Sequence, residues 1–307
     1  MSFSLHLSAV LWTLSVTTAH WCYQAQYSCN QTCRAPGDWF TIFPKCGGNR
    51  QSPINIVTNK VQHDPNLTAL SFLGYHDAHN ITVENVGHSA HFSLPPSLRI
   101  RGGNLMDTYK AVQFHLHWGY DASPGSEHTL DGERLPMELH VVHIKERYNS
   151  LEEAENDTSG IALLAFFFQE SSEDNVHFSV LVDALGRVRN VGDSYTIRGL
   201  RFGEIIPGPH ELHGYYRYAG SMTTPGCDQA VVWTIFQTTI PVSRRQLASV
   251  SRQLVFHSGK PMSEIFRPVQ RLNGRTVYWS AASSVLPSRA AVWLCALGVL
   301  GRHWHTR

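Results

Sequence analysis

The amino-acid sequence predicts one mainly β domain (α+β), with a few short helices at its periphery. Of the 307 residues, 42% are hydrophobic and 16% are charged, a balance typical of a globular chain with a large core. Short runs rich in β-branched and aromatic residues recur between Pro, Gly, Asn and Asp, whereas long helical periodicity is scarce. No internal repeat or linker divides the chain between its two ends. We therefore expect a single, sheet-dominated domain.

The predicted strands are spread along the whole domain. They are NITVENV at 80–86, AVQFHLHW at 111–118, MELHVVHIK at 137–145, IALLAFFF at 161–168, FSVLVDAL at 178–185 and AVVWTIFQTTI at 230–240. The clearest helix is predicted at 243–256, where Ser243 is a suitable N-cap. The acidic segment 151–156 is predicted to be a loop or turn.

Charge argues against a nucleic-acid partner. The formal net charge is +1 and the basic residues do not cluster, so the positive face expected of a nucleic-acid binder is missing. Histidine, by contrast, is abundant, with 18 residues. Because imidazole is both a proton carrier at physiological pH and the commonest metal ligand, this abundance indicates metal or proton chemistry.

Both ends of the chain resemble processing signals. Residues 1–19 contain a short apolar run followed by small residues, which predicts a secretory signal peptide. Residues 281–307 follow the small residues SAASS and contain an apolar stretch, which predicts a GPI-attachment signal that is removed. The alternative is a single membrane helix, but about a dozen apolar residues are fewer than the ~20 needed to span a bilayer. The expected mature domain is 20–280, anchored at the extracellular face of the plasma membrane.

A secretory destination fits two other features. The chain has glycosylation sequons at Asn30, Asn66, Asn80 and Asn156, each of which predicts a surface position. An oxidising compartment also favours disulfides among the cysteines of the expected mature chain, which are Cys22, Cys29, Cys33, Cys46 and Cys227. Because their number is odd, one thiol stays unpaired or pairs with another chain.

Histidine spacing predicts a candidate metal site. His115 and His117 are two residues apart on a predicted strand, so their side chains leave the same face. His140 and His143 are three apart, so only one of them can join the site. Glu138 shares a face with His140 and can orient an imidazole, which favours His140. Three imidazoles would leave one position of a tetrahedral zinc ion open to water, but spacing alone leaves ordinary polar histidines equally open.

Longer motifs occur in a fixed order along the chain. They are QSPINI at 51–56, GHSAHF at 87–92, QFHLHWG at 113–119, SEHTLDG at 126–132, MELHVVH at 137–143 and SMTTPG at 221–226, followed by Trp233. Together these motifs resemble those of the α-carbonic anhydrases, and the similarity extends over about residues 20–280. The secretory start, early cysteines and anchor-like tail look most like the membrane-anchored, type IV branch of that family.

The resemblance implies a fold and an activity. The fold is a central, mostly antiparallel, twisted sheet of about ten strands with peripheral short helices. The activity is reversible hydration of carbon dioxide to bicarbonate and a proton, by zinc-bound hydroxide at the bottom of a cleft. The resemblance also implies inhibition by aromatic sulfonamides and makes a bicarbonate transporter a candidate partner.

The same resemblance assigns roles to the metal-site residues. It implies that Zn²⁺ is held by His115, His117 and His140, the set that the strand spacing also favours. It implies further that Gln113 and Glu138 orient the imidazoles through hydrogen bonds.

Catalytic and substrate-binding roles are also implied by the resemblance. Glu127 accepts the hydroxyl proton of Thr223, so that Thr223 in turn orients the hydroxide. His88 is the proton shuttle, because its imidazole can accept a proton and release it to buffer. The substrate-binding residues implied are Val142, Leu163, Met222, Thr223, Thr224, Val231 and Trp233.

Disulfide pairing is implied by the resemblance rather than by spacing. It pairs Cys46 with Cys227, which would stiffen the loop that carries Thr223. It also pairs Cys22 with Cys33 and leaves Cys29 over, although an exchange between Cys29 and Cys33 stays open.

Two other functions remain as alternatives. A tri-histidine zinc site can activate water against esters or phosphates, so the metal chemistry alone does not select the substrate. A cell-surface binding module without catalysis could use the same fold, but such relatives usually lack one of the histidine ligands. All three histidines are present here.

Overall fold

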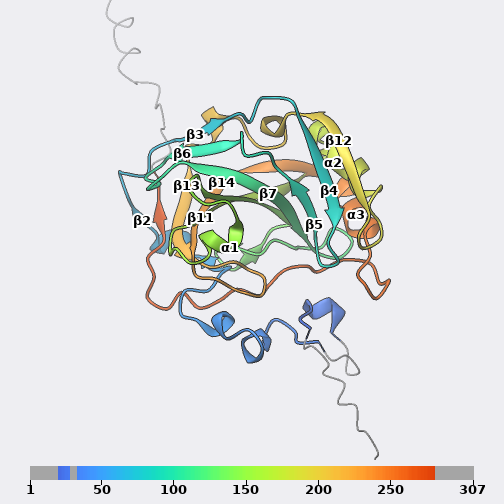
Figure 1. Ribbon diagram of the computed structural model, residues 1–307, viewed down its shortest axis with the longest axis horizontal. Coiled ribbons are helices and arrows are strands. Elements are labelled where there is room, and N and C mark those ends of the chain that lie inside the picture. Colours follow the sequence, from blue (N-terminus) through green and yellow to red (C-terminus); the bar gives the residue numbers. More distant parts are fainter. Residues whose placement is uncertain (1–19, 28–32, 281–307) are drawn as a thin grey trace, which may run out of the picture.

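The computed structural model describes residues 20–27 and 33–280, and a twisted sheet forms its centre (Figure 1). The strand order of this sheet is β12 (Ser194–Leu200), β4 (His79–Asn85), β5 (Ala90–Ser93), β7 (Tyr109–Trp118), β10 (Met137–Lys145), β11 (Ile161–Ser171), β14 (Val231–Ser243), β13 (Tyr215–Gly220), β15 (Tyr278–Trp279) and β2 (Gln62–His63). In this order, neighbours are antiparallel except for the parallel pairs β11 with β14 and β15 with β2. The predicted fold class is therefore confirmed.

The remaining elements lie around this sheet. β3 (Leu70–Leu73) pairs with β6 (Arg99–Gly102), which joins the sheet through β7, while β1 (Asn55–Ile56), β8 (Thr129–Leu130) and β9 (Glu133–Arg134) form a small separate sheet. Short 3₁₀ helices occupy Gln24–Gln26, Trp39–Thr41, Pro44–Gly47, Thr58–Lys60, Phe202–Glu204 and Pro209–Glu211.

The prediction of a strand at 178–185 is wrong, because this segment belongs to α2 (Val176–Leu185). The Asn175 side chain caps the helix by accepting hydrogen bonds from the first backbone amides. The buried residues of α2 include Phe178, Leu181, Val182 and Leu185, which recur at helical spacing and form one apolar face. A run rich in valine and leucine therefore forms a helix here, because a cap and a 3.6-residue period act together.

The other helix predictions had mixed outcomes. α3 (Arg244–Gln253) is confirmed, and the Ser243 hydroxyl accepts a hydrogen bond from the Gln246 amide as expected of an N-cap. The predicted loop at 151–156 is partly wrong, because α1 (Leu151–Ala154) forms one short helical turn capped by Ser150. Figure 1 shows α2 and α3 near the β12 and β4 end of the sheet.

The central strands β7 and β10 are covered on both faces, and each face packs against a different hydrophobic cluster. Phe114, Leu116 and Val141 point into the main hydrophobic core. Val142, together with Leu163 of β11, packs into a second hydrophobic cluster. Because side chains alternate along a strand, the polar residues of β7 and β10 that share the second face are brought together beside this cluster.

Two disulfides are present among the described residues. Cys22 is joined to Cys33 and Cys46 to Cys227, the two pairs implied by the family resemblance. The Cα atoms are 5.7 Å and 4.9 Å apart respectively.

Several predictions concern residues outside the described ranges, namely the signal peptide at 1–19, the sequon at Asn30, the additional Cys29 and the tail at 281–307. Among the described sequons, Asn66, Asn80 and Asn156 are exposed, as predicted. In the described part of the chain, no helix has the length and apolar character needed to cross a membrane.

Candidate metal centre

Three histidines meet where the neighbouring strands β7 and β10 run side by side. The strand register places His140 directly opposite His115, and Glu138 opposite His117. One ring nitrogen from each of His115, His117 and His140 lies within 4.8 Å of the others. His143 is on the other face, where its Nε2 lies 2.7 Å from the Tyr75 hydroxyl. The structure therefore brings together the predicted set and leaves His143 out.

Each imidazole is fixed by a hydrogen bond at one nitrogen, which leaves the other nitrogen free. His115 Nδ1 lies 2.9 Å from Gln113 Oε1, and His140 Nε2 lies 2.7 Å from Glu138 Oε1. His117 Nδ1 lies 2.7 Å from the backbone carbonyl of Ile265. Gln113 and Glu138 thus contact the rings as the resemblance implied. No sequence pattern indicates the role of Ile265, because a backbone carbonyl is available at every position.

The free nitrogens fit a metal ion. His117 Nε2 and His140 Nδ1 are buried and have no hydrogen-bond partner among the described residues. Buried polar atoms without a partner are costly, so two such atoms facing one space suit a ligand that would satisfy both. Tetrahedral zinc with three protein nitrogens and one open position matches this donor set.

Electrostatics keep the candidate ligands in the form that binds metal. Burial lowers the pKa of both His115 and His117, and neighbouring histidines lower the pKa of His115 further. Only neutral imidazole has a lone pair for a metal. The two rings are therefore neutral at physiological pH.

Glu138 is the centre of a buried hydrogen-bond network. Its carboxylate accepts from the backbone amides of Glu127 and His128, both at 2.8 Å, and contacts His128 Nδ1 at 2.7 Å. Although burial alone would raise the pKa of Glu138, the partners His128 and His140 hold it well below its usual value. His128 Nε2 continues the network to the Tyr218 hydroxyl at 2.6 Å. The carboxylate that orients His140 is thus itself held in place.

The pair formed by Glu127 and Thr223 is only partly as expected. Glu127 is fully buried, and its Oε1 accepts a hydrogen bond of 2.7 Å from the backbone amide of Arg267. Its Oε2 lies 3.5 Å from His117 Nε2 and has no hydrogen-bond partner in the described structure. The expected hydrogen bond from Thr223 to Glu127 is not formed. Oε2 is turned toward the imidazoles instead.

Arg267 is a structural residue that sequence reasoning missed. Its side chain is 1% exposed and donates hydrogen bonds to Gln51 Oε1 and to the backbone carbonyls of Ser52 and Cys46. Together with its amide contact to Glu127, this ties the amino-terminal segment to the floor of the site. Nothing in the local pattern around position 267 indicates this role, because all its partners are distant in sequence.

The histidines open into a cleft with a cavity of about 190 Å³. Of the predicted substrate residues, Leu163, Met222, Thr223 and Thr224 line this cavity. The others, Val142, Val231 and Trp233, are buried in the hydrophobic cluster that contains Leu163. Apolar side chains therefore border one part of the cleft, and their role in binding carbon dioxide stays a prediction.

His88 also lines the cleft, at some distance from the ring nitrogens that face one another. Its ring packs edge-on against Trp21, with centroids 4.7 Å apart, and against His91, with centroids 5.9 Å apart. Burial, followed by the positive charge that His117 and His257 can carry, lowers the pKa of His88 to about 4. His88 is therefore neutral over the physiological pH range, and a pKa this low makes it a weaker proton acceptor than a free imidazole.

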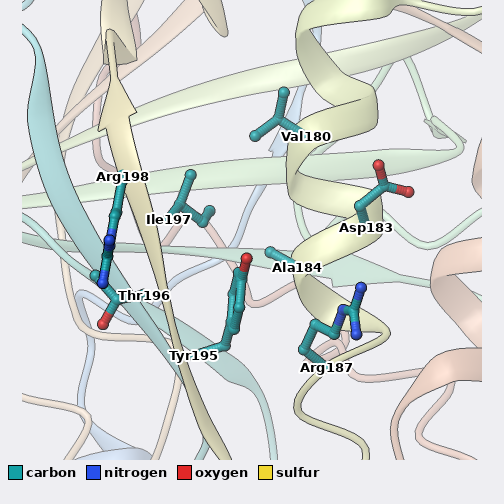
Figure 2. Close-up of a pocket in the computed structure, with 8 residues that line it drawn as sticks. All are labelled: Val180, Asp183, Ala184, Arg187, Tyr195, Thr196, Ile197 and Arg198. Atoms are coloured by element: carbon teal, nitrogen blue, oxygen red, sulfur yellow. The ribbon is translucent and has the colours of Figure 1, made fainter.

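A larger cavity, of about 780 Å³, lies elsewhere, between α2 and the edge strand β12 (Figure 2). Its lining residues include Asp183, Arg187, Tyr195 and Arg198, and none is a histidine or cysteine. It is remote from the three ligand histidines and adds no group to the chemistry described above.

Comparisons with known proteins agree with this geometry. The model of the eukaryotic-type carbonic anhydrase family matches residues 34–281. Carbonic anhydrase 4 of Oryctolagus cuniculus is 40% identical over 288 residues, covering 93% of this chain and 92% of that protein. Carbonic anhydrase 15 of Mus musculus is 36% identical, covering 92% and 89%, and carbonic anhydrase 6 of Homo sapiens is 36% identical, covering 78% of each. Members of this family are zinc enzymes that hydrate carbon dioxide. The chain belongs to the eukaryotic-type carbonic anhydrases and is a carbonate dehydratase.

Proposed function

We propose that this chain hydrates carbon dioxide reversibly with Zn²⁺ held by His115, His117 and His140. The observation that carries the proposal is the set of three buried imidazoles, each oriented by a hydrogen bond, whose free nitrogens share one space. When bound, zinc supplies a Lewis acid that makes a nucleophile from water near neutral pH, an effect for which carbonic anhydrase is itself the standard example.

The residues around the metal position the two reactants. Leu163 and Met222 offer an apolar surface to carbon dioxide, which has no polar group strong enough to anchor it. Thr223 accepts a hydrogen bond from the nucleophile and so directs a lone pair toward the carbon. We assign Glu127 as the acceptor for the Thr223 hydroxyl proton, a hydrogen bond that the described structure does not form. In support, its Oε2 is buried without a hydrogen-bond partner in the described structure and can take that proton donor.

His88 accepts the proton that hydration releases and passes it to buffer. In support, it lines the same cleft as the three ligand histidines, and its ring contacts that of His91. The lowered pKa of His88 favours release of the proton to buffer over its uptake. His91 lies between His88 and His115, with ring centroids 5.9 Å and 5.5 Å away.

The decisive experiment measures zinc content, carbon dioxide hydration and its block by an aromatic sulfonamide on the same preparation. We expect about one zinc per chain and sulfonamide-sensitive hydration. His140→Ala removes one ligand and should lose both zinc and activity, whereas His143→Gln on the opposite face of β10 should retain zinc. A zinc-loaded protein without hydration activity would favour the binding-module alternative. Faster hydrolysis of esters or phosphates than hydration would favour the other hydrolytic function.

We further propose that the enzyme works at the cell surface, attached through a GPI anchor. The support comes from the sequence patterns of residues 1–19 and 281–307, which lie outside the described residues, and from two disulfides, which suit an oxidising compartment. In that location the substrate and product are extracellular carbon dioxide and bicarbonate, and a bicarbonate transporter is a fitting partner.

A further inference from the structure

Two carboxylates line the cleft outside the histidine cluster. Glu155 directly follows α1, and Asp228 directly follows Cys227. Both side chains border the cavity into which the three ligand histidines open. They also influence each other electrostatically, because the negative charge of Asp228, after the larger effect of burial, raises the pKa of Glu155. The metal chemistry described above uses neither of them.

Asp228 is a buried carboxylate with only one of its oxygens bonded. The residue is 5% exposed, and its Oδ1 is paired with the ammonium of Lys45. Its Oδ2 has no hydrogen bond to any described residue. A Cβ atom at Gly226 would lie 2.5 Å from Oδ2, so the glycine leaves this oxygen uncovered. The Lys45 side chain is 66% exposed, which places its charge toward solvent.

Glu155 has a less favourable environment still. Its carboxylate makes no hydrogen bond or ion pair within the described structure, although the side chain is partly buried. Burial and the neighbouring Asp228 both disfavour its ionised form. When both carboxyl groups are ionised they share one ammonium, that of Lys45, which leaves these three side chains with a net negative charge. An added cation would offset both the burial of the Glu155 carboxylate and its repulsion by Asp228.

A separate observation indicates that the cleft holds polar ligands. The hydroxyl groups of Tyr23 and Ser89 line the same cavity, and both residues are more than nine-tenths buried, at 0% and 3% exposure. Neither hydroxyl has a hydrogen-bond partner in the described part of the chain. Since buried hydroxyls are normally satisfied by protein groups or water, these two groups are available to hydrogen-bond a polar ligand in the cleft. Carbon dioxide alone does not meet that description.

We propose that Glu155 and Asp228 form a cation-selective subsite in the cleft, which favours ligands that carry a protonated amine or imidazole outside the metal. The inference rests on the proposed function, because the probe that tests it is anchored on the zinc ion. Opposite charges in a partly solvated cleft attract by enough to change affinity about three- to tenfold, and salt weakens the effect. The subsite therefore changes the relative affinities of ligands that differ in charge, but it does not determine whether a ligand binds.

The test uses three benzenesulfonamides that differ only in the para substituent, which is aminoethyl, carboxyethyl or propyl. Dissociation constants for the cationic and anionic probes are each divided by that of the neutral probe. We expect the wild-type protein to prefer the cation, and Glu155→Gln to reduce the preference about three- to tenfold. Glu173→Gln is the matched control, because Glu173 lies exposed between β11 and α2, outside the cavity lining, and its loss changes the net charge equally.

Each outcome is informative. An unchanged preference in Glu155→Gln, or an equal decrease in Glu173→Gln, overturns the subsite. If the neutral probe fails to bind the zinc-loaded wild-type protein, the proposed function is wrong instead. If Glu155→Gln does not fold, the same dissociation constants are measured for the wild-type protein at low and high salt. We expect a higher salt concentration to reduce the cation preference. A preference that salt does not change contradicts the proposal.

Discussion

At the scale of single residues, the cleft contrasts two kinds of buried histidine. His115, His117 and His140 keep one ring nitrogen free, whereas His143 has its nitrogens near the Tyr75 hydroxyl and backbone carbonyls of Val141 and Ala162. The sequence already distinguishes His140 from His143, because side chains alternate along a strand and two residues three apart face opposite ways. The β-bulge between Val142 and His143 does not reverse this assignment.

His88 gives a prediction on catalysis. We expect His88→Ala to lower turnover about tenfold or more in weak buffer, since a positioned proton acceptor is lost, while zinc content and kcat/KM stay the same. Addition of a small imidazole buffer should restore turnover. Stopped-flow hydration assays at several buffer concentrations measure this, and unchanged turnover in weak buffer would remove His88 from the role.

His143 gives a prediction on stability. Burial lowers its pKa to about 4 in the folded protein, against an ordinary value of 6.5. On acidification the unfolded chain therefore takes up this proton first, so the free energy of unfolding falls as the pH drops from about 6.5 toward 4. Between about pH 7.5 and pH 5 we expect His143 alone to cost about 2 kcal/mol.

Urea unfolding of zinc-free protein at both pH values measures this effect. His143→Gln should show a smaller loss on acidification than the wild type, whereas His210→Gln should not differ from it, because the His210 side chain is 83% exposed. Equal losses in wild type and His143→Gln would contradict the assignment.

At the scale of elements, prediction succeeded where one local signal decided the structure. Runs rich in β-branched and aromatic residues became β7, β10, β11 and β14, and a serine cap with helical periodicity became α3. The segment at 178–185 misled because valine and leucine favour strands, while its helical period and the Asn175 cap determined the outcome.

For the metal site, only the side chains around the metal position were predictable from the sequence. Ligand spacing and family motifs gave the three histidines, Gln113 and Glu138. Long-range partners such as Arg267 and the Ile265 carbonyl have no local pattern, because the folded chain brings them from far away in sequence. The orientation of Glu127 Oε2 is likewise a property of the assembled site.

The disulfide from Cys46 to Cys227 holds the loop that carries Thr223, and Cys227 has a left-handed backbone, with φ of 53°. We expect Cys46→Ser with Cys227→Ser to lower the free energy of unfolding by about 2–5 kcal/mol and also to lower activity, because the loop loses its tether. Removing Cys22 and Cys33 should cost less, since they close a loop of 11 residues rather than 181. Thermal unfolding of both variants, with hydration assays, compares the two losses of stability. An equal loss, or a larger loss without Cys22 and Cys33, would contradict the prediction.

At the scale of the whole molecule, the attachment to the membrane is the main prediction. On intact cells expressing the full chain, phosphatidylinositol-specific phospholipase C should release active enzyme into the medium, because a GPI anchor ends in a cleavable lipid. Replacing residues 281–307 with a known spanning helix provides the control that stays bound. Enzyme of the natural chain that also stays bound after treatment would argue for a spanning tail.

The long separation between Cys46 and Cys227 also has a consequence for biosynthesis. In the proposed secretory route, at a synthesis rate of about 5–20 residues per second, Cys46 would enter the oxidising compartment roughly 10–40 seconds before its partner exists. During that interval the thiols nearest to it are Cys22, Cys29 and Cys33. Early closure of the short Cys22–Cys33 bridge removes two of these competitors. The order in which the bridges are oxidised therefore governs the yield of correctly paired enzyme, and a disulfide isomerase is needed whenever Cys46 reacts too soon.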